Sequence, residues 1–200
     1  DVDRSRGLGD VYKRQTLAYH EATPGHHHQI AHSLENEDLT LYRRFGYFTS
    51  AFAEGWALYS EILALEAGLA EDPYDELGIL QSELFRAVRL VVDTGMHYKR
   101  WTREEAMKYM KTKTGMSDTE VRVEIERYIV WPGQALSYKV GMIKILELRE
   151  KAMSELGDKF NIKDFHSAVL DHGNPPLFIV EEMVNNCLLY TSPSPRDLST

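Results

Sequence analysis

The chain has 200 residues, of which 43% are hydrophobic and 10% aromatic, so it can form one substantial core but hardly two. Its formal net charge of -8 argues against nucleic acid or an anionic membrane surface as the main partner, because both favour faces rich in lysine and arginine. The sequence contains no apolar run near the roughly 20 residues that a membrane helix needs. The single cysteine, Cys187, excludes an intramolecular disulfide framework and a cysteine-based zinc cluster, so any metal would be held by histidine and carboxylate.

The two ends of the chain differ from its middle. Residues 1–15 show no apolar periodicity, and residues 187–200 form a stretch rich in serine and proline. Both resemble translated sequencing-adapter read-through, and we expect both to be non-native. Residues 16–186 are then expected to be the C-terminal part of a longer domain. A targeting signal would lie in the missing part, so the sequence assigns no compartment.

The middle of the chain has apolar residues at spacings of three and four, which predicts an all-α fold without strands. A first helix is expected over residues 16–34, interrupted at Pro24-Gly25, and a second over 41–67. Further helices are expected over about 74–97, 103–113, 118–130, 134–156, 162–170 and 176–186. The helix over 74–97 carries an apolar stripe formed by Leu77, Leu80, Leu84, Val88, Val91 and Val92.

Five of the eight histidines lie between residues 20 and 32. The pair His20-Glu21 followed by further histidines is similar to the motif H-E-x-x-H, in which two imidazoles one helical turn apart bind zinc and the glutamate activates water. The spacing differs, however. In an unbroken helix His20 and His26 would lie about 600° apart around the helix axis, so their rings would diverge. His27 would return to the side of His20 but lie about 10 Å farther along the axis.

A bulge at Pro24-Gly25 would correct this spacing. Pro24 cannot donate to the carbonyl of His20 and opens that turn, while Gly25 tolerates the resulting backbone. Two bulged residues would place His26 where the second histidine of the motif normally lies. We therefore predict that His20 and His26 share a metal, with His27 as the alternative to His26.

A zinc site also needs a third protein ligand and an open position for water. Asp93 and several glutamates are candidates, and Glu54 stands out among them. It lies between apolar neighbours and next to Gly55, where another backbone or a ligand can approach closely. A carboxylate buried in such a setting would need a cation as its partner.

Four segments together resemble the bacterial domain-of-unknown-function family 885, and the resemblance covers nearly all of residues 16–186. These segments are His20–His27 (HEATPGHH), Phe52–Ala57 (FAEGWA), Arg89–His97 (RLVVDTGMH) and Arg127–Lys139 (RYIVWPGQALSYK). That family is similar in turn to the helical gluzincin peptidases of the angiotensin-converting-enzyme type. The resemblance implies that the chain is the C-terminal portion of a two-walled helical peptidase, in which the missing part supplies the other wall of the cleft.

The resemblance also implies roles for individual residues. His20, His26 and Glu54 would be the zinc ligands, and Glu21 the general base. Tyr138 would donate a hydrogen bond to the oxyanion, with His97 as a second candidate. The spacer between the histidines is two residues longer than in those peptidases, which keeps His27 open as a ligand.

The predicted function is a zinc-dependent hydrolase that cleaves peptide bonds by metal-activated water. Two alternatives stay open: a catalytically silent zinc-binding scaffold, and a zinc hydrolase of another amide or an ester. The expected partners are a peptide substrate and Zn²⁺, with no nucleic acid and no membrane span, and the oligomeric state is open. Arg89 and Asp93, four residues apart on one helix, are expected either to pair with each other or to bind a substrate carboxylate.

Overall fold

A computed structural model describes residues 14–46, 48–70 and 72–190 of the chain, without the side chains of residues 189 and 190. Throughout these residues the regular structure is helical, which confirms the predicted all-α fold. None of the helices that the structure describes is both long and apolar enough to cross a membrane. Most of residues 1–15 and 187–200 lie outside the described residues, so their expected non-native origin stays a prediction.

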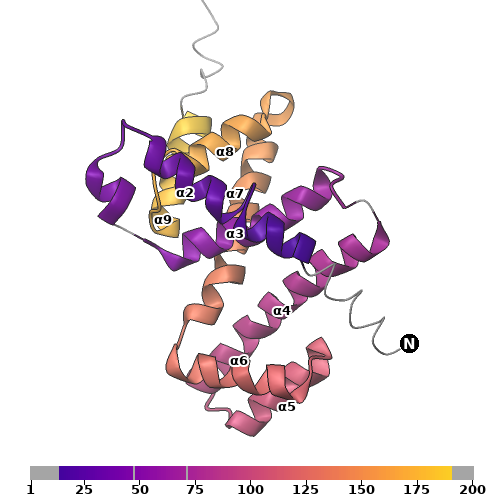
Figure 1. Cartoon of the computed structure of the whole chain (residues 1–200). Helices are drawn as coiled ribbons and strands as arrows, with labels where there is room; N and C mark the ends of the chain where they lie inside the picture. Colours follow the sequence, from indigo (N-terminus) through magenta and orange to yellow (C-terminus); the bar gives the residue numbers. More distant parts are fainter. Residues whose placement is uncertain (1–13, 47, 71, 191–200) are drawn as a thin grey trace, which may run out of the picture.

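The first described helix covers residues 14–21. It is followed in chain order by α2 (His26–Glu35), η1 (Tyr42–Gly46), α3 (Ser50–Glu66), α4 (Pro73–His97), α5 (Arg103–Thr114), α6 (Asp118–Val130), η2 (Gln134–Leu136), α7 (Ser137–Leu156), η3 (Gly157–Lys159), α8 (Ile162–Leu170), α9 (Leu177–Val184) and η4 (Asn185–Tyr190) (Figure 1). Helices η1 and η4 are π-helical, and η2 and η3 are 3-10 helices.

Capping residues explain why several helices begin where the sequence predicts. The Thr102 backbone N–H donates to Glu105 Oε2 at 2.7 Å, and the Glu105 N–H donates to Thr102 Oγ1 at 3.2 Å. This reciprocal pair satisfies N–H groups that have no partner within the first turn of α5. Asp72 caps α4 and Ser117 caps α6 in the same way.

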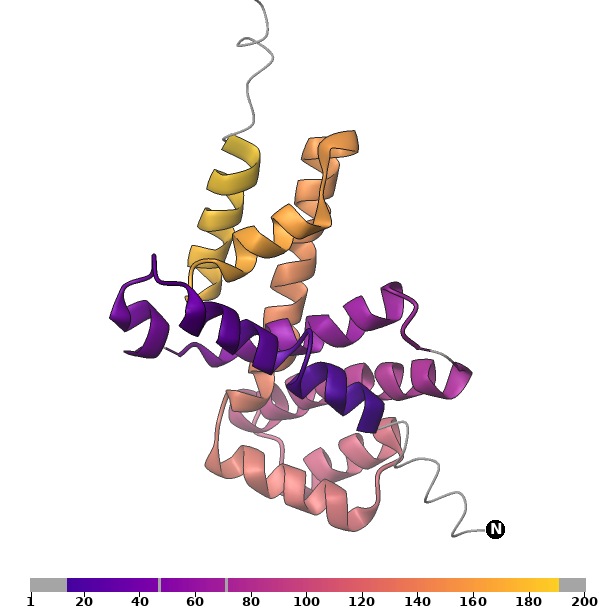
Figure 2. The same ribbon diagram turned by 45° about the horizontal axis from the view of Figure 1, so that its top comes forward.

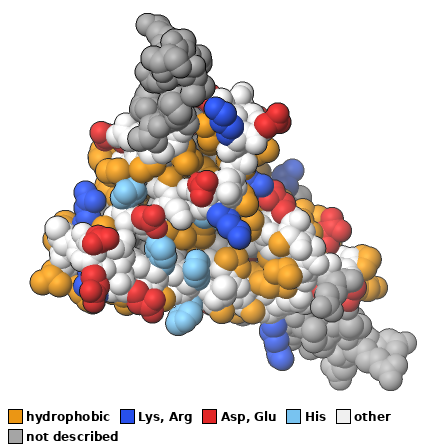
Figure 3. Space-filling model, turned by 90° about the horizontal axis from the view of Figure 1, so that it is seen from above, with side chains coloured by type: hydrophobic (Ala, Val, Ile, Leu, Met, Phe, Trp, Pro, Cys, Tyr) orange, Lys and Arg blue, Asp and Glu red, His pale blue; other side chains and the backbone are white. Residues whose placement is uncertain are grey.

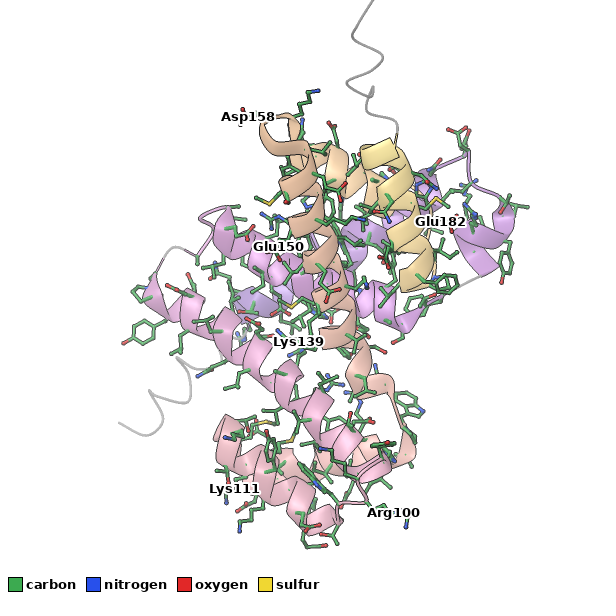
Figure 4. All side chains as sticks on the ribbon, turned by 180° about the vertical axis from the view of Figure 1, so that it is seen from behind. Arg100, Lys111, Lys139, Glu150, Asp158 and Glu182 are labelled. Atoms are coloured by element: carbon green, nitrogen blue, oxygen red, sulfur yellow. The ribbon has the colours of Figure 1, made fainter. Side chains whose placement is uncertain are left out.

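The helices pack around two apolar cores, which α4 and α7 connect (Figure 1). The first core lies among α3, α7, α8 and α9, and the second among α4, α5 and α6. Figure 4 shows Lys139, at the start of α7, where the two groups of helices meet, and Arg100 and Lys111 at the far end of the second group. Lys139 forms an ion pair with Glu83 of α4, which ties the two groups together.

Two glycines let α3 and α7 approach closely where they cross. A Cβ atom added to Gly55 of α3 would lie 2.4 Å from the Cα of Gly141 in α7. One added to Gly141 would lie 1.9 Å from the backbone oxygen of Ala51. The two backbones are therefore in direct contact, and a larger side chain at either position would push the helices apart.

The prediction of one helix over residues 41–67 is wrong. The π-helical turn η1 ends at Gly46, and Thr49 has an extended backbone before α3 begins at Ser50. Asn174 holds this break open, because its Oδ1 accepts from the Thr49 N–H at 3.0 Å and its backbone oxygen accepts from Thr49 Oγ1 at 3.1 Å. These bonds reach across 125 residues, so the local apolar pattern could not reveal them.

The apolar stripe of α4 is only partly buried. Val88 and Val92 lie in the second core, at 4% and 0% exposure. Leu77, Leu80 and Leu84 are each nearly half exposed, whereas Ile79 of the same half of α4 is buried.

We expect Gly141→Ala to lower the free energy of unfolding by about 1–3 kcal/mol, because the added methyl group would force α3 and α7 apart. Urea denaturation followed by circular dichroism measures this. Ser154→Ala changes an exposed position of the same helix and should stay within about 0.5 kcal/mol of the wild type. A Gly141→Ala variant as stable as the wild type would contradict the tight crossing.

Candidate metal centre

His20 is buried at the end of the first described helix, with 2% of its surface exposed. Its Nδ1 lies 2.7 Å from Oε1 of Glu61, and its Nε2 lies 3.7 Å from Oε2 of Glu54. If Nδ1 carries the proton, it donates to Glu61, and Nε2 presents its lone pair towards Glu54. Both carboxylates come from α3, which packs beneath this helix.

The predicted break in the helix lies at residues 22–25, and Figure 2 shows it as a change of direction between the first helix and α2. The Thr23-Pro24 peptide bond is cis, and the Pro24 carbonyl accepts from the indole N–H of Trp56 at 2.9 Å. A Cβ atom at Gly25 would lie 1.9 Å from the carbonyl oxygen of His20, so only glycine fits this position.

His26 is the first residue of α2, and the break brings it next to His20. Its Nε2 lies 3.2 Å from Oε2 of Glu54, and the two imidazole rings meet edge to face with centroids 4.9 Å apart. One donor atom each from His20, His26 and Glu54 lie within 4.8 Å of one another. The structure thus brings together the three residues expected to bind a metal, while their role as ligands stays a prediction.

The charge distribution of this cluster favours a cation. Burial by itself would raise the pKa of Glu54, but hydrogen bonds with His20, His26 and Tyr138 lower it to about 2. Burial by itself would lower the pKa of His20, yet its bonds to Glu54 and Glu61 raise it above the usual value. A position that strengthens proton binding has a negative potential, and the same potential attracts a divalent metal ion.

Glu61 is a member of the cluster that the sequence analysis missed. It is 1% exposed, and its Oε2 is buried without a hydrogen-bond partner among the described residues. A signal existed: Glu61 lies seven residues after Glu54, two turns along the same face of an otherwise apolar helix. Its hydrogen bond to Nδ1 of His20, the ring nitrogen that does not face Glu54, is typical of carboxylates that orient a metal-binding histidine.

Tyr138 of α7 completes the wall beside His20. Its ring stacks on the His20 ring, with the centroids 6.1 Å apart, and its hydroxyl helps to lower the pKa of Glu54. The Arg89 guanidinium lies 4.3 Å from the Tyr138 ring centroid, and Gln134 Nε2 lies 3.4 Å from the Tyr138 hydroxyl. Tyr138 therefore contributes both its ring and its hydroxyl to the surroundings of the cluster.

The remaining candidate residues lie outside the cluster of ligand atoms. Glu21 is exposed and directly follows His20, and His27 is exposed and directly follows His26. His97 is not brought to the cluster. It lies about 12 Å farther along α4 than Arg89. Its Nε2 is 3.0 Å from the carbonyl oxygen of Tyr128.

Asp93 has a structural partner instead of a metal or Arg89. Its carboxylate accepts from the Gly133 backbone N–H, at 3.0 and 3.2 Å from its two oxygens. Of the two alternatives for Arg89 and Asp93, pairing with each other is therefore wrong, because the Gly133 N–H occupies the Asp93 carboxylate. Binding of a substrate carboxylate stays a prediction. Gly133 has a φ of 83°, so the turn before η2 also depends on glycine.

The cluster fits zinc. Two imidazoles and one carboxylate are a donor set of catalytic zinc sites, which leave a fourth position open. Around a tetrahedral zinc, with bonds of about 2.0–2.2 Å, ligand atoms lie roughly 3.3–3.6 Å apart. The distances of 3.2 and 3.7 Å from Glu54 Oε2 to the two imidazole nitrogens agree with this spacing.

Figure 3 shows histidine side chains gathered on one face of the molecule, and two of the histidines beyond the cluster have well-defined partners. His32 Nε2 lies 2.7 Å from Oδ1 of Asp171, and His166 Nε2 lies 2.8 Å from the Tyr59 hydroxyl. Burial, and next the Arg149 guanidinium, lower the pKa of His166 to about 4. His166 is therefore neutral near pH 7, and in the tautomer that leaves Nε2 unprotonated it accepts a hydrogen bond from the Tyr59 hydroxyl.

One protein family and two proteins of known structure are similar to this chain. The family model "Bacterial protein of unknown function (DUF885)" matches residues 3–184, which includes most of residues 1–15 and ends before residue 187. The crystal structure of a candidate lipoprotein from Colwellia psychrerythraea is similar, with 55% identity and a TM-score of 0.84 over 88% of this chain. A candidate lipoprotein of unknown function from Shewanella oneidensis is 29% identical, with a TM-score of 0.78 over 84% of this chain.

The matched region is 30% of the Colwellia chain and 31% of the Shewanella chain, so this chain spans less than a third of either relative. No curated protein matches the chain.

The free energy of unfolding should fall as the pH drops from about 6.5 to about 4, because the unfolded chain then protonates His166 while the folded chain does not. We expect His166→Gln to remove on the order of 1–2 kcal/mol of this pH dependence, since the ring is only partly buried. Urea denaturation at pH 7 and pH 4.5 measures it. The control His27→Gln, at an exposed position, should keep the wild-type difference, and an unchanged difference in His166→Gln would contradict the prediction.

Proposed function

This chain belongs to the DUF885 family of bacterial proteins, and we propose that it carries the zinc centre of a hydrolase that cleaves peptide bonds. The observation that supports this most directly is the approach of His20, His26 and Glu54 to within 4.8 Å across a broken helix. A paired histidine and glutamate, a second histidine and a glutamate from a later helix are also the pattern of the helical gluzincin peptidases. Mere surface histidines would not account for the half-buried Glu54 and the buried Glu61 that lie against them.

The three side chains would hold the metal, and Glu61 orients the His20 ring. A zinc ion bound here would supply Lewis acidity, to polarise the scissile carbonyl and to acidify the attacking water. Glu61 Oε1, 2.7 Å from Nδ1, accepts the His20 N–H and so directs the Nε2 lone pair towards Glu54. Without Glu61, the His20 ring could adopt the other tautomer.

Glu21 is the general base of the proposed reaction. It follows the ligand His20 directly and is exposed, so its carboxylate is open to water and substrate. The carboxylate takes a proton from the water that attacks the carbonyl carbon. As the carbon–nitrogen bond breaks, it delivers this proton to the leaving nitrogen.

Tyr138 stabilises the negative charge that develops on the carbonyl oxygen. Its ring stacks on His20, and its hydroxyl helps to lower the pKa of Glu54. A donor in this position contributes most in the transition state, when the oxygen is most negative, and losing such a donor typically costs about 10²–10³ in rate.

Zinc content tests the ligand set. We expect the purified 200-residue chain to retain one zinc ion and His26→Ala to lose it, because the carboxylate and one imidazole bind zinc weakly by themselves. His27→Ala is the matched control, since it removes a neighbouring exposed histidine, and it should retain zinc. Elemental analysis after dialysis measures the content, with circular dichroism as the check on folding. Zinc lost from His27→Ala and kept by His26→Ala would reverse the assignment.

Hydrolysis tests the catalytic role. Glu21→Gln should retain zinc but cleave a mixed peptide library about 10²–10⁴ times more slowly than the wild type, because the base is lost. Mass spectrometry of the products measures cleavage, and Glu35→Gln, at an exposed position of α2, should keep wild-type activity. If the chain cleaves acyl esters but not peptides, this would support a zinc hydrolase of other substrates. A zinc-loaded wild type that cleaves neither would support a silent scaffold.

A further inference from the structure

Two further histidines of α2 lie one helical turn apart. His28 and His32 are four residues apart, so their side chains leave α2 on the same face. Their ring centroids are 6.1 Å apart, and the rings are tilted by 41°. His28 lies about 200° around the helix axis from His26, so this pair is on the other side of α2 from the candidate metal centre. Two imidazoles at this spacing are the helical zinc ligands of the motif H-E-x-x-H.

Asp171 adds a carboxylate to the pair. It directly follows α8, which lies beside α2 (Figure 1). Its Oδ1 lies 2.7 Å from His32 Nε2, and its backbone oxygen accepts from Asn36 Nδ2 at 3.1 Å. His28, His32 and Asn36 follow one another at intervals of four along α2, so Asp171 lies along the face that carries both histidines.

His28 also lies close to α8. Burial and the Arg149 guanidinium lower the pKa of His166 in α8 most, and the charge of His28 lowers it further. Such an effect weakens with distance and is screened by water, so it requires that the two rings be near each other. The face of α2 that carries His28 is therefore turned towards α8.

The three side chains offer donors that zinc prefers. Two imidazoles and one carboxylate bind Zn²⁺ with bonds of about 2.0–2.2 Å, so their ligand atoms lie roughly 3.3–3.6 Å apart. The atoms of His32 and Asp171 would separate slightly from their present 2.7 Å to admit the ion, and the His28 ring would turn towards them. Both movements are open to these side chains, because His28 is exposed and the Asp171 side chain is 45% exposed.

An ion in this position would fasten α2 to the rest of the molecule. The buried residues of α2 are Gln29 and Ser33, both polar, so burial of apolar side chains does little to hold the helix in place. Gln29 Oε1 is moreover buried without a hydrogen-bond partner among the described residues. Because α2 begins at His26, its position also sets the position of one ligand of the candidate metal centre.

We propose that His28, His32 and Asp171 form a second metal site, which binds Zn²⁺ between α2 and the end of α8. The site is separate from the candidate metal centre and does not depend on the proposed hydrolase. Its side chains are more exposed, so it binds zinc more weakly and releases it on dialysis. Its role is to hold α2 in place, and it takes no part in the chemical step.

Calorimetric titration with Zn²⁺ tests this site, with His26→Ala as the parent because it removes an imidazole of the candidate metal centre. We expect the parent to bind one Zn²⁺. Losing an outer partner of a metal ligand typically costs about 10–100-fold in affinity, so losing the ligand His28 in an added His28→Ala should cost at least about tenfold. An added His27→Ala removes the neighbouring exposed histidine and should bind as the parent does.

An added Asp171→Asn separates a site between two helices from an isolated pair of histidines. The amide can still accept a hydrogen bond from His32 but is a poor zinc ligand, so we expect about tenfold weaker binding or more. Unchanged binding in Asp171→Asn would show an adventitious ion on the histidine pair only and would overturn the proposal.

The absence of Zn²⁺ binding by the parent, or binding that persists in His28→Ala, would also overturn it. Circular dichroism checks that each variant is folded. If His26→Ala fails to fold, the wild-type chain is titrated instead. His28→Ala should then bind one Zn²⁺ fewer per chain than the wild type, and an equal number would contradict the second site.

Discussion

The direct contact between α3 and α7 at Gly55 and Gly141 is the constraint on which the rest of the structure depends. Glu54 directly precedes Gly55, and Tyr138 lies one turn before Gly141, so the contact that brings the backbones together also brings the carboxylate and the hydroxyl together. With side chains larger than glycine at this crossing, α3 and α7 would separate by the width of a methyl group or more. The cluster would then lose the geometry that lets its donor atoms share an ion.

A second constraint is the balance of buried charge around His20. Two carboxylates, two imidazoles and two guanidiniums lie in and around a site that water scarcely reaches, where unpaired charge is costly. Glu54 and Glu61 offset this cost by bonding the histidines. The guanidiniums of Arg86 and Arg89 have only neutral hydrogen-bond partners among the described residues, so the charge balance is incomplete on the side of α4. The proposed metal ion would balance the carboxylates on the side of the histidines.

The sequence predicts the helices well where local signals decide them, and poorly where distant partners do. The capping box at Thr102, the break at Pro24-Gly25 and the long helix α4 depend on neighbouring residues, and all three are confirmed. The single helix expected over residues 41–67 is wrong, because Asn174 opens the backbone at Thr49. Glu61 was missed for the same reason, since its partner His20 lies 41 residues away.

By itself, the sequence determined the all-α class and the residue types that can bind a metal, because helical periodicity and the chemistry of histidine and glutamate are local properties. It also limited the second histidine to His26 or His27, since the Pro-Gly bulge could be argued from backbone geometry alone. Only the tertiary structure brought His26 next to Glu54, placed Glu61 against Nδ1 of His20, gave Asp93 and His97 other partners, and left Arg86 facing a cavity. These outcomes depend on which surfaces of α3, α4 and α7 come into contact, and packing between helices distant in sequence leaves no periodic trace in the chain.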